Sequence, residues 1–237
     1  MALNMFKYFF SFCFLVFLFL AVRSSTDSFH FEKFDMNSEK FNSEIMIHLD
    51  ATFDVEGSYI KMTQPWNLSA GIVTYQQPIR LTKKGSFSTH FSFSMSSERN
   101  EYGIMFIMSL EGYLSKYFTR DFVAVQLDTN YDQEFGNVNH VGIYVNRPAS
   151  VNRVAHSVVK LELNSGKRLH CWVDYEASLK QVEVRVARWG EKRPVHPSLY
   201  CPIDLSEMFN TKNVYLAFTS TSGYSNQICM LYSWSFE

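Results

Sequence analysis

The sequence has little net charge, few cysteines, and no repeated or low-complexity segment. Its formal net charge is −1, so it has neither a basic field that would hold nucleic acid nor an acidic tail that would attract a cationic partner. No long amphipathic helix can be traced along the chain. The 237 residues, 46% of them hydrophobic, are enough for the packed core of one large domain.

Cysteine usage narrows the chemistry further. None of the four cysteines forms a C-x-x-C pair, which argues against a zinc site or a redox pair. Cys13 lies in the N-terminal leader, and the rest of the chain keeps three others, Cys171, Cys201 and Cys229. In an oxidising compartment an odd set allows at most one internal disulfide and leaves a spare thiol. Buried free thiols in strands are an equally supported alternative.

The N-terminus has the order of a secretory signal peptide. Lys7 precedes an apolar run, 9–22, that only Ser11 interrupts, and Ser24 and Ser25 follow it. The run is short for a bilayer, which needs about 20 residues. We therefore expect residues 1–25 to be a cleaved signal peptide, with an uncleaved anchor as the less favoured alternative. Residues 26–237 should form one secreted domain without a membrane span.

The rest of the chain reads as strands separated by turns. Aromatic residues make up 16% of the sequence, which favours strands. In 86–95, Phe87 and Phe91 face one way while Ser88 and His90 face the other, as in a strand with one wet face. The segments 104–108 and 122–127 are nearly all apolar, which suits strands covered on both faces. The longest loop candidates are 62–70, 129–139, 147–156 and 189–198. This pattern predicts an all-β sandwich or barrel.

One stretch, 122–146, combines strand and polar-loop features. It contains a buried strand, a polar loop and a second strand that opens at His140. Oxygen and imidazole groups from the strand ends and the loop can converge on a cation. The residues concerned are Asp128, Asp132, Glu134, Asn137 and His140. From spacing alone, an ordinary polar hairpin loop is the favoured reading.

This stretch also resembles a family signature. The legume-lectin signature reads valine-alanine-valine-glutamate-phenylalanine-aspartate-threonine, followed by asparagine-histidine-valine-glycine-isoleucine-aspartate. The likeness continues through other segments of the chain: 29–31, 78–93, 171–175, 214–223 and 233–236. It is closest to the extracellular domain of plant lectin receptor kinases, without their membrane helix or kinase. The resemblance implies a concanavalin A-like jelly-roll sandwich of two antiparallel sheets, with a sugar site at one sheet edge.

The resemblance implies only part of a metal site. In that family one calcium and one transition ion hold the sugar loop rigid before the sugar binds. Asp128 and His140 match metal ligands, and Asp132 matches a loop asparagine that contacts calcium and sugar. Asn137, or the residue before it in another register, falls where an aspartate bridges the metals, and Gln126 replaces a glutamate. With fewer carboxylates, we expect a weak calcium site at most and no manganese site.

The carbohydrate site that the resemblance implies is altered as well. Its candidate residues are Glu101, Tyr102, Gly103, Tyr131, Asp132 and Phe135. Tyr102 stands where the family has an aspartate that accepts two sugar hydroxyls, and Glu101 substitutes for it only if the loop shifts by one residue. Tyr131 and Phe135 can stack on a pyranose face, or can simply pack within the loop. We expect single sugars to bind weakly or not at all.

Three classes of function remain open. The first is a lectin with a degraded site, and the second is an extracellular module that binds a protein or an apolar ligand. The third is a glycosidase of the same architecture, which needs two carboxyl groups about 5 Å apart. Because Gln126 stands two residues before Asp128, the first carboxyl is missing, and we expect no enzyme.

The first class implies further properties. We expect a secreted plant lectin to lie in the apoplast or cell wall and to bind a glycan or glycoprotein. A homodimer is the possible assembly. Asn67 lies in a glycosylation sequon, Asn67-Leu68-Ser69, within a predicted loop.

Overall fold

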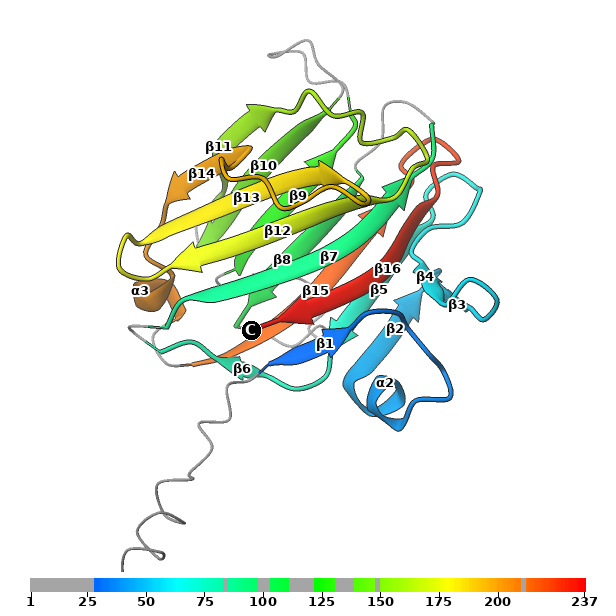
Figure 1. Ribbon diagram of the computed structural model, residues 1–237, viewed down its shortest axis with the longest axis horizontal. Helices are drawn as coiled ribbons and strands as arrows, with labels where there is room; N and C mark the ends of the chain where they lie inside the picture. The colour runs from blue at the N-terminus through cyan, green and yellow to red at the C-terminus, as the bar shows by residue number, and fades with distance from the viewer. Residues whose placement is uncertain are drawn as a thin grey trace, which may run out of the picture.

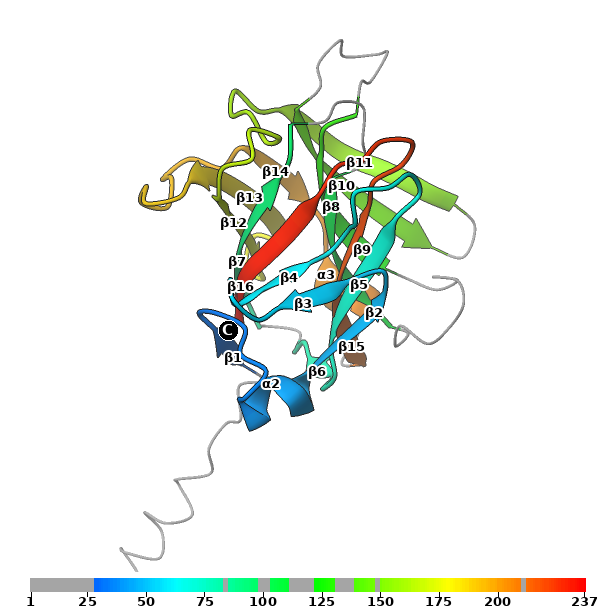
Figure 2. The same cartoon turned by 90° about the vertical axis from the view of Figure 1, so that its right-hand side faces the viewer.

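The protein folds as two antiparallel β-sheets stacked face to face. The computed structural model describes residues 28–82, 85–97, 103–110, 122–130, 139–147, 150–209 and 212–237. Figure 1 looks onto one sheet with the other behind it, and Figure 2 shows the two layers from the side. Within these residues each sheet has eight strands, and every pairing is antiparallel. The predicted sandwich of two antiparallel sheets is therefore confirmed.

We call the nearer layer of Figure 1 sheet I. In spatial order its strands are β14 (Leu199–Pro202), β13 (Gln181–Arg188), β12 (Leu169–Glu176), β7 (Phe87–Met95), β16 (Cys229–Phe236), β4 (Tyr59–Lys61) and β3 (Thr52–Asp54), with β1 (Phe29–Phe31) also on β16. Because β1 pairs with the last strand, the start of the described chain lies beside its end.

The second layer is sheet II. In spatial order its strands are β11 (Ser150–Val158), β10 (His140–Arg147), β9 (Phe122–Asp128), β8 (Ile104–Ser109), β15 (Asn213–Thr221), β5 (Ala70–Tyr75) and β2 (Ile45–Leu49), with β6 (Ile79–Arg80) also on β15. Two short helices, α2 (Glu39–Glu44) and α3 (Leu205–Phe209), lie at the periphery of the sandwich (Figure 1). None of the described helices is long and apolar enough to cross a membrane.

The core lies between the two sheets. On β7 the side chains of Phe87, Phe91 and Phe93 point into it, as the alternation of this strand predicted. Trp234 is fully buried there and packs edge-on against Phe218 at 4.8 Å between ring centroids. Its indole Nε1–H donates to Thr89 Oγ1 at 3.1 Å, so the one polar group of this ring is satisfied inside the core.

The outer face of β7 departs from the prediction. Ser92 and Ser94 were expected on a wet face, but both are buried. Ser92 lies under Arg168, which donates to its hydroxyl, and Ser94 Oγ is 2.9 Å from Tyr232 Oη. Long side chains from neighbouring strands therefore cover a row of small polar ones.

One loop prediction was wrong. The segment 147–156 was predicted to be a loop, yet β11 begins at Ser150 and pairs with β10 along its length. The pairing shifts by one residue between Ile143 and Tyr144. Pairing with a neighbouring strand, which a local pattern does not reveal, makes this polar segment a strand.

The three described cysteines are buried and form no disulfide with one another. Cys171, Cys201 and Cys229 lie on three different strands of sheet I, namely β12, β14 and β16. Burial raises the pKa of the Cys171 and Cys201 thiols, which keeps them protonated. The alternative of buried thiols therefore holds for the described part of the chain, rather than one internal disulfide.

Candidate functional site

The candidate site starts from a residue pair across two strands of sheet II. Asp128, the last residue of β9, lies opposite His140, the first residue of β10. Asp128 Oδ2 is 3.4 Å from His140 Nε2, and both side chains are almost completely buried. The hairpin register therefore brings together the two metal ligands that the signature predicted.

Gln126 completes the group from the same face of β9. Because side chains alternate along a strand, Gln126 and Asp128 project to one side while Leu127 points into the core. Gln126 Nε2 donates to Asp128 Oδ2 at 3.0 Å, and the backbone N–H of Asn130 donates to Asp128 Oδ1 at 2.7 Å. Both carboxylate oxygens thus accept hydrogen bonds from the protein itself.

A second histidine lies beside His140. The rings of His140 and His156 are 4.6 Å apart between centroids, and His156 comes from β11. No sequence motif includes His156, because its neighbour becomes apparent only when β11 pairs with β10. The Nδ1 atom of His140 is buried and has no hydrogen-bond partner among the described residues.

Gly103 brings the start of β8 against the end of β9. It has a φ of +64°, and a Cβ atom at this position would lie 2.0 Å from Leu127 O. Its carbonyl accepts a hydrogen bond from Ser220 Oγ at 2.7 Å. Only glycine combines this conformation with so close an approach to a neighbouring backbone. Gly103 therefore fixes where the chain enters the sheet edge at Asp128.

The loop 222–228 adds residues that the sequence did not assign to the site. It joins β15 to β16, and Gln227 Nε2 donates to Thr129 Oγ1 at 3.1 Å, directly after Asp128. Ser222 Oγ donates to Trp66 O at 2.8 Å, which ties the loop before β5 to the same edge. Tyr224 at the tip of this loop is 85% exposed. These residues become neighbours of Asp128 through the order of strands in sheet II, which no local sequence pattern shows.

The comparisons with known proteins agree with this geometry. The sequence model described as the legume lectin domain matches residues 26–237. The chain belongs to the legume lectin domain family. Its structural neighbours are lectins, which are binding proteins rather than enzymes, and they share the concanavalin A-like sandwich.

Several relatives illustrate the likeness. The probable L-type lectin-domain containing receptor kinase S.7 of Arabidopsis thaliana is 31% identical over 71% of this chain and 29% of its own length. Receptor kinase IV.3 of the same plant is 29% identical over 95% of this chain and 38% of its own length. The chain therefore spans roughly a third of the length of these curated relatives.

Solved lectin structures share the fold. A winged bean acidic lectin complexed with methyl-α-D-galactose superposes with a TM-score of 0.68, at 22% identity over 88% of this chain and 96% of the other. Peanut lectin with a bound 9mer peptide superposes with a TM-score of 0.66, at 27% identity over 88% of this chain and 95% of the other. This chain and these lectins thus share one sandwich fold.

The described residues alone do not make up the two-ion site expected of a legume lectin domain, and the predicted ligands Asp132 and Asn137 lie outside them. They contain no group of three His, Cys, Asp or Glu side chains placed to hold a metal. Asp128 is the one carboxylate in the group formed with Gln126 and His140, and an amide proton points at it. Hard cations require several oxygen ligands, so this arrangement favours an internal hydrogen-bond network over a metal cluster.

Most of the predicted sugar residues lie outside the described part of the chain. These are Glu101, Tyr102, Tyr131, Asp132 and Phe135, together with the predicted metal ligand Asn137. Gly103 is described and lies at the predicted edge. Asn67 is exposed in the loop between β4 and β5, whereas Ser69 of the same sequon is buried.

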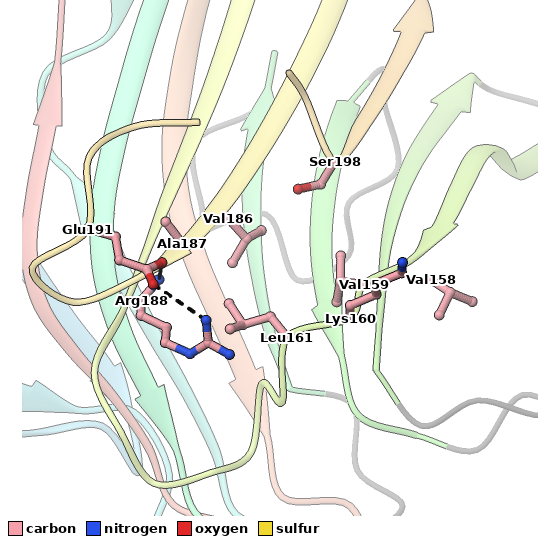
Figure 3. A pocket seen from close by; sticks show the side chains of 9 residues that line it. All are labelled: Val158, Val159, Lys160, Leu161, Val186, Ala187, Arg188, Glu191 and Ser198. Atoms are coloured by element: carbon pink, nitrogen blue, oxygen red, sulfur yellow. Dashed lines mark hydrogen bonds and ion pairs between the residues drawn. The ribbon is translucent and has the colours of Figure 1, made fainter. Parts of the chain in front are cut away.

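A depression elsewhere shows no comparable convergence of polar groups. It has a volume of about 360 Å³ and lies between the end of β13 and the segment that follows β11 (Figure 3). Apolar side chains such as Leu161 and Val186 line it, and the ion pair of Arg188 with Glu191, at 3.4 Å, lies at one side. We therefore take the Asp128 edge as the candidate site.

Proposed function

We propose that this chain is an extracellular lectin-like protein that binds carbohydrate through a degraded legume-lectin site, without a tightly held metal. The observation that carries this proposal is the hydrogen bond from the Gln126 amide to Asp128. The amide donates where the family has a carboxylate, so it supplies the positive end of a dipole to Asp128 instead of a second negative charge.

The electrostatics of the site support metal independence. Two carboxylates at this separation would repel one another unless a cation lay between them. Here the amide, the Asn130 N–H and the His140 ring surround the single Asp128 carboxylate. Fewer anionic ligands weaken the binding of calcium, and an internally satisfied carboxylate does not need the ion to fold.

The surface near this edge suits a ligand larger than one sugar ring. Tyr224, Trp66 and Leu68 are 85%, 51% and 64% exposed and come from two loops joined by hydrogen bonds. Aromatic rings offer broad apolar area to the faces of sugars and to protein side chains alike. The same observation favours the second candidate function, an extracellular module that binds a protein or an apolar ligand.

A glycan array in calcium and in chelator tests the proposal. We expect binding of extended glycans that chelator does not abolish, and loss of that binding in Tyr224→Ala. Leu179→Ala is the matched control, because Leu179 is 65% exposed in the turn between β12 and β13 of sheet I. Calorimetry with free monosaccharides tests whether the sugar pocket is degraded. A Kd tighter than about 0.1 mM would show an intact pocket. An array without any glycan signal would favour the interaction module.

Extracellular location is the second part of the proposal. The order of Lys7, the apolar run and the serines at 24 and 25 supports cleavage of residues 1–25. Intact-mass analysis of the protein from a secreting plant cell should give a chain that begins near residue 26. A mature chain that retains residues 1–20 would contradict this.

A further inference from the structure

The outer face of sheet I carries a groove that the candidate site does not use. It consists of two adjoining depressions of about 390 and 570 Å³ that share His30, His90 and Ser235. Its floor lies on β7 and β16, which run side by side in the near layer of Figure 1, with β12 on one side and β1 on the other. We call it the Arg168 groove, lined by His30, His90, Arg168, His170, Trp189 and Ser235.

One wall of the Arg168 groove is a stack of rings. His90 Nε2 and His170 Nδ1 are 2.9 Å apart, so one ring donates a hydrogen bond to the other. His90 stacks on Trp172 at 4.8 Å, and His170 stacks on Trp189 at 4.6 Å, between ring centroids. Each ring therefore fixes its neighbour, and the nitrogen atoms of the two imidazoles are held in place beside the groove.

Arg168 is a cation whose described neighbours are aromatic rings and a serine. Its guanidinium lies 3.5 Å above the Trp189 ring and 4.7 Å from that of Tyr232, and it donates to Ser92 Oγ from Nε and Nη2 at 3.0 and 2.7 Å. In the described residues no carboxylate lies within ion-pair distance of it.

Other arginines of the same sheet differ in this respect. Arg185 Nη1 is 2.9 Å from Asp174 Oδ2, and Arg193 Nη2 is 2.6 Å from the same oxygen. Arg168 is half-buried, and burial lowers the pKa of its guanidinium, so the charge is partly desolvated without a counter-ion. A cation in this state gains more from an incoming anion than a fully hydrated one does.

We propose that the Arg168 groove is a second binding site, specific for acidic sugars, in which the carboxylate of a uronate pairs with Arg168 and its hydroxyls bond to the imidazoles and serines. On the floor, Ser235 is half-buried and its hydroxyl can bond to a sugar hydroxyl, whereas Ser233 Oγ is buried and bonded to Ser92 Oγ. The exposed part of Trp189 supplies an apolar edge for a pyranose face.

The shape of the groove favours an oligosaccharide over a single anion. The two depressions follow each other along the sheet, and Lys40 and Arg193 line the further one. Two acidic side chains at the rim have partners: Glu32 is 3.5 Å from His30, and Asp174 accepts from Arg193. Glu237 also lines the further depression. Arg168 is the half-buried cation of the nearer one, where one uronate would anchor while its neighbours extend along the groove.

This site is independent of the one proposed above. It lies on the outer face of sheet I, whereas Asp128 lies on sheet II. A titration in chelator therefore isolates it from any calcium effect. Calorimetry on the whole mature chain measures the binding of three probes. They are a short oligomer of galacturonic acid, its methyl ester, and inorganic phosphate.

We expect the free acid to bind and its methyl ester to bind at least 10-fold more weakly, because the ester removes only the charges. Arg168→Met should weaken binding of the acid by about 10- to 100-fold. Arg80→Met is the matched control: it removes the same charge from an exposed position on β6 of sheet II, and binding should change less than about 2-fold. Arg168→Lys, which keeps the charge but not the fork of donors, should give an intermediate loss and serves if the methionine variant does not fold.

Several results would overturn the proposal. No binding of the acidic oligomer at about 5 mM, or equal binding of the ester and the acid, would contradict it. Equal losses in the Arg168 and Arg80 variants would show a diffuse charge effect. Displacement by phosphate at the same concentration as the sugar acid would show a general anion site instead of a saccharide site.

Discussion

The hydrogen-bonded histidine pair should make the stability of this protein depend on pH. Burial, together with the positive charges of His170, His30, Arg168 and Arg193, lowers the pKa of His90 from 6.5 to about 4. The folded protein therefore binds this proton less tightly than the unfolded chain does. The stabilisation is fully present above pH 6.5 and is lost as the pH falls from 6.5 towards 4.

The size of the effect follows from the same values. A fall from 6.5 to about 4 corresponds in full to about 3.4 kcal/mol, at about 1.36 kcal/mol for each tenfold change in proton affinity. Because the His90 ring is partly exposed, solvent screening reduces this contribution to about 1–2 kcal/mol. In a domain of this size that free energy shifts the melting temperature by about 2–8 °C.

His90→Gln isolates the contribution. The glutamine amide can still bond to His170 but does not titrate in this range. Differential scanning calorimetry of both proteins between pH 7.5 and 4 gives the difference, in which the carboxylates common to both cancel. The wild type should lose about 2–8 °C more than the variant over this interval. Parallel curves for the two proteins would refute the reasoning.

Three further predictions concern the candidate site and the core. Gly103→Ala should lower the free energy of unfolding by more than about 2 kcal/mol in chemical denaturation, because the alanine would combine a positive φ with a Cβ 2.0 Å from Leu127 O. Gly190→Ala, which has a positive φ but open space around the Cβ, should cost only about 1 kcal/mol, and equal costs would contradict the clash. Gln126→Glu should lower the melting temperature in chelator and gain stabilisation from calcium, because it replaces a donor to Asp128 with a second carboxylate; an unchanged calcium response would contradict this. A thiol reagent should modify the native protein far more slowly than the unfolded one, and fast reaction would show exposure of the three buried cysteines, Cys171, Cys201 and Cys229.

The sequence was most informative where one strand alternates or one motif spans a hairpin. The phenylalanines of β7 indicated their buried face directly, and the signature of β9 and β10 predicted that Asp128 and His140 belong to one site, which their pairing bears out as a contact. Both signals are local, since a strand alternates with period two and a hairpin joins neighbours in the chain.

The missed features depend on strands that are distant in sequence. His156 meets His140 only through the pairing of β11 with β10, and Arg168 covers Ser92 across strands more than seventy residues apart. The loop that carries Tyr224 reaches the Asp128 edge because β15 pairs with β8. Local sequence patterns do not show such neighbours. The strand within 147–156, which was predicted to be a loop, and the Arg168 groove both follow from the order of strands in the sheets.

The central claim is that the Gln126, Asp128 and His140 group holds the site together without a metal. The most direct test is thermal melting of the mature chain in calcium and then in excess chelator. Stabilisation by a bound ion grows with its concentration over its Kd, so a weak site adds little. We predict a difference of at most a few degrees, and a loss of more than about 10 °C in chelator, which corresponds to several kcal/mol in a domain of this size, would contradict the claim.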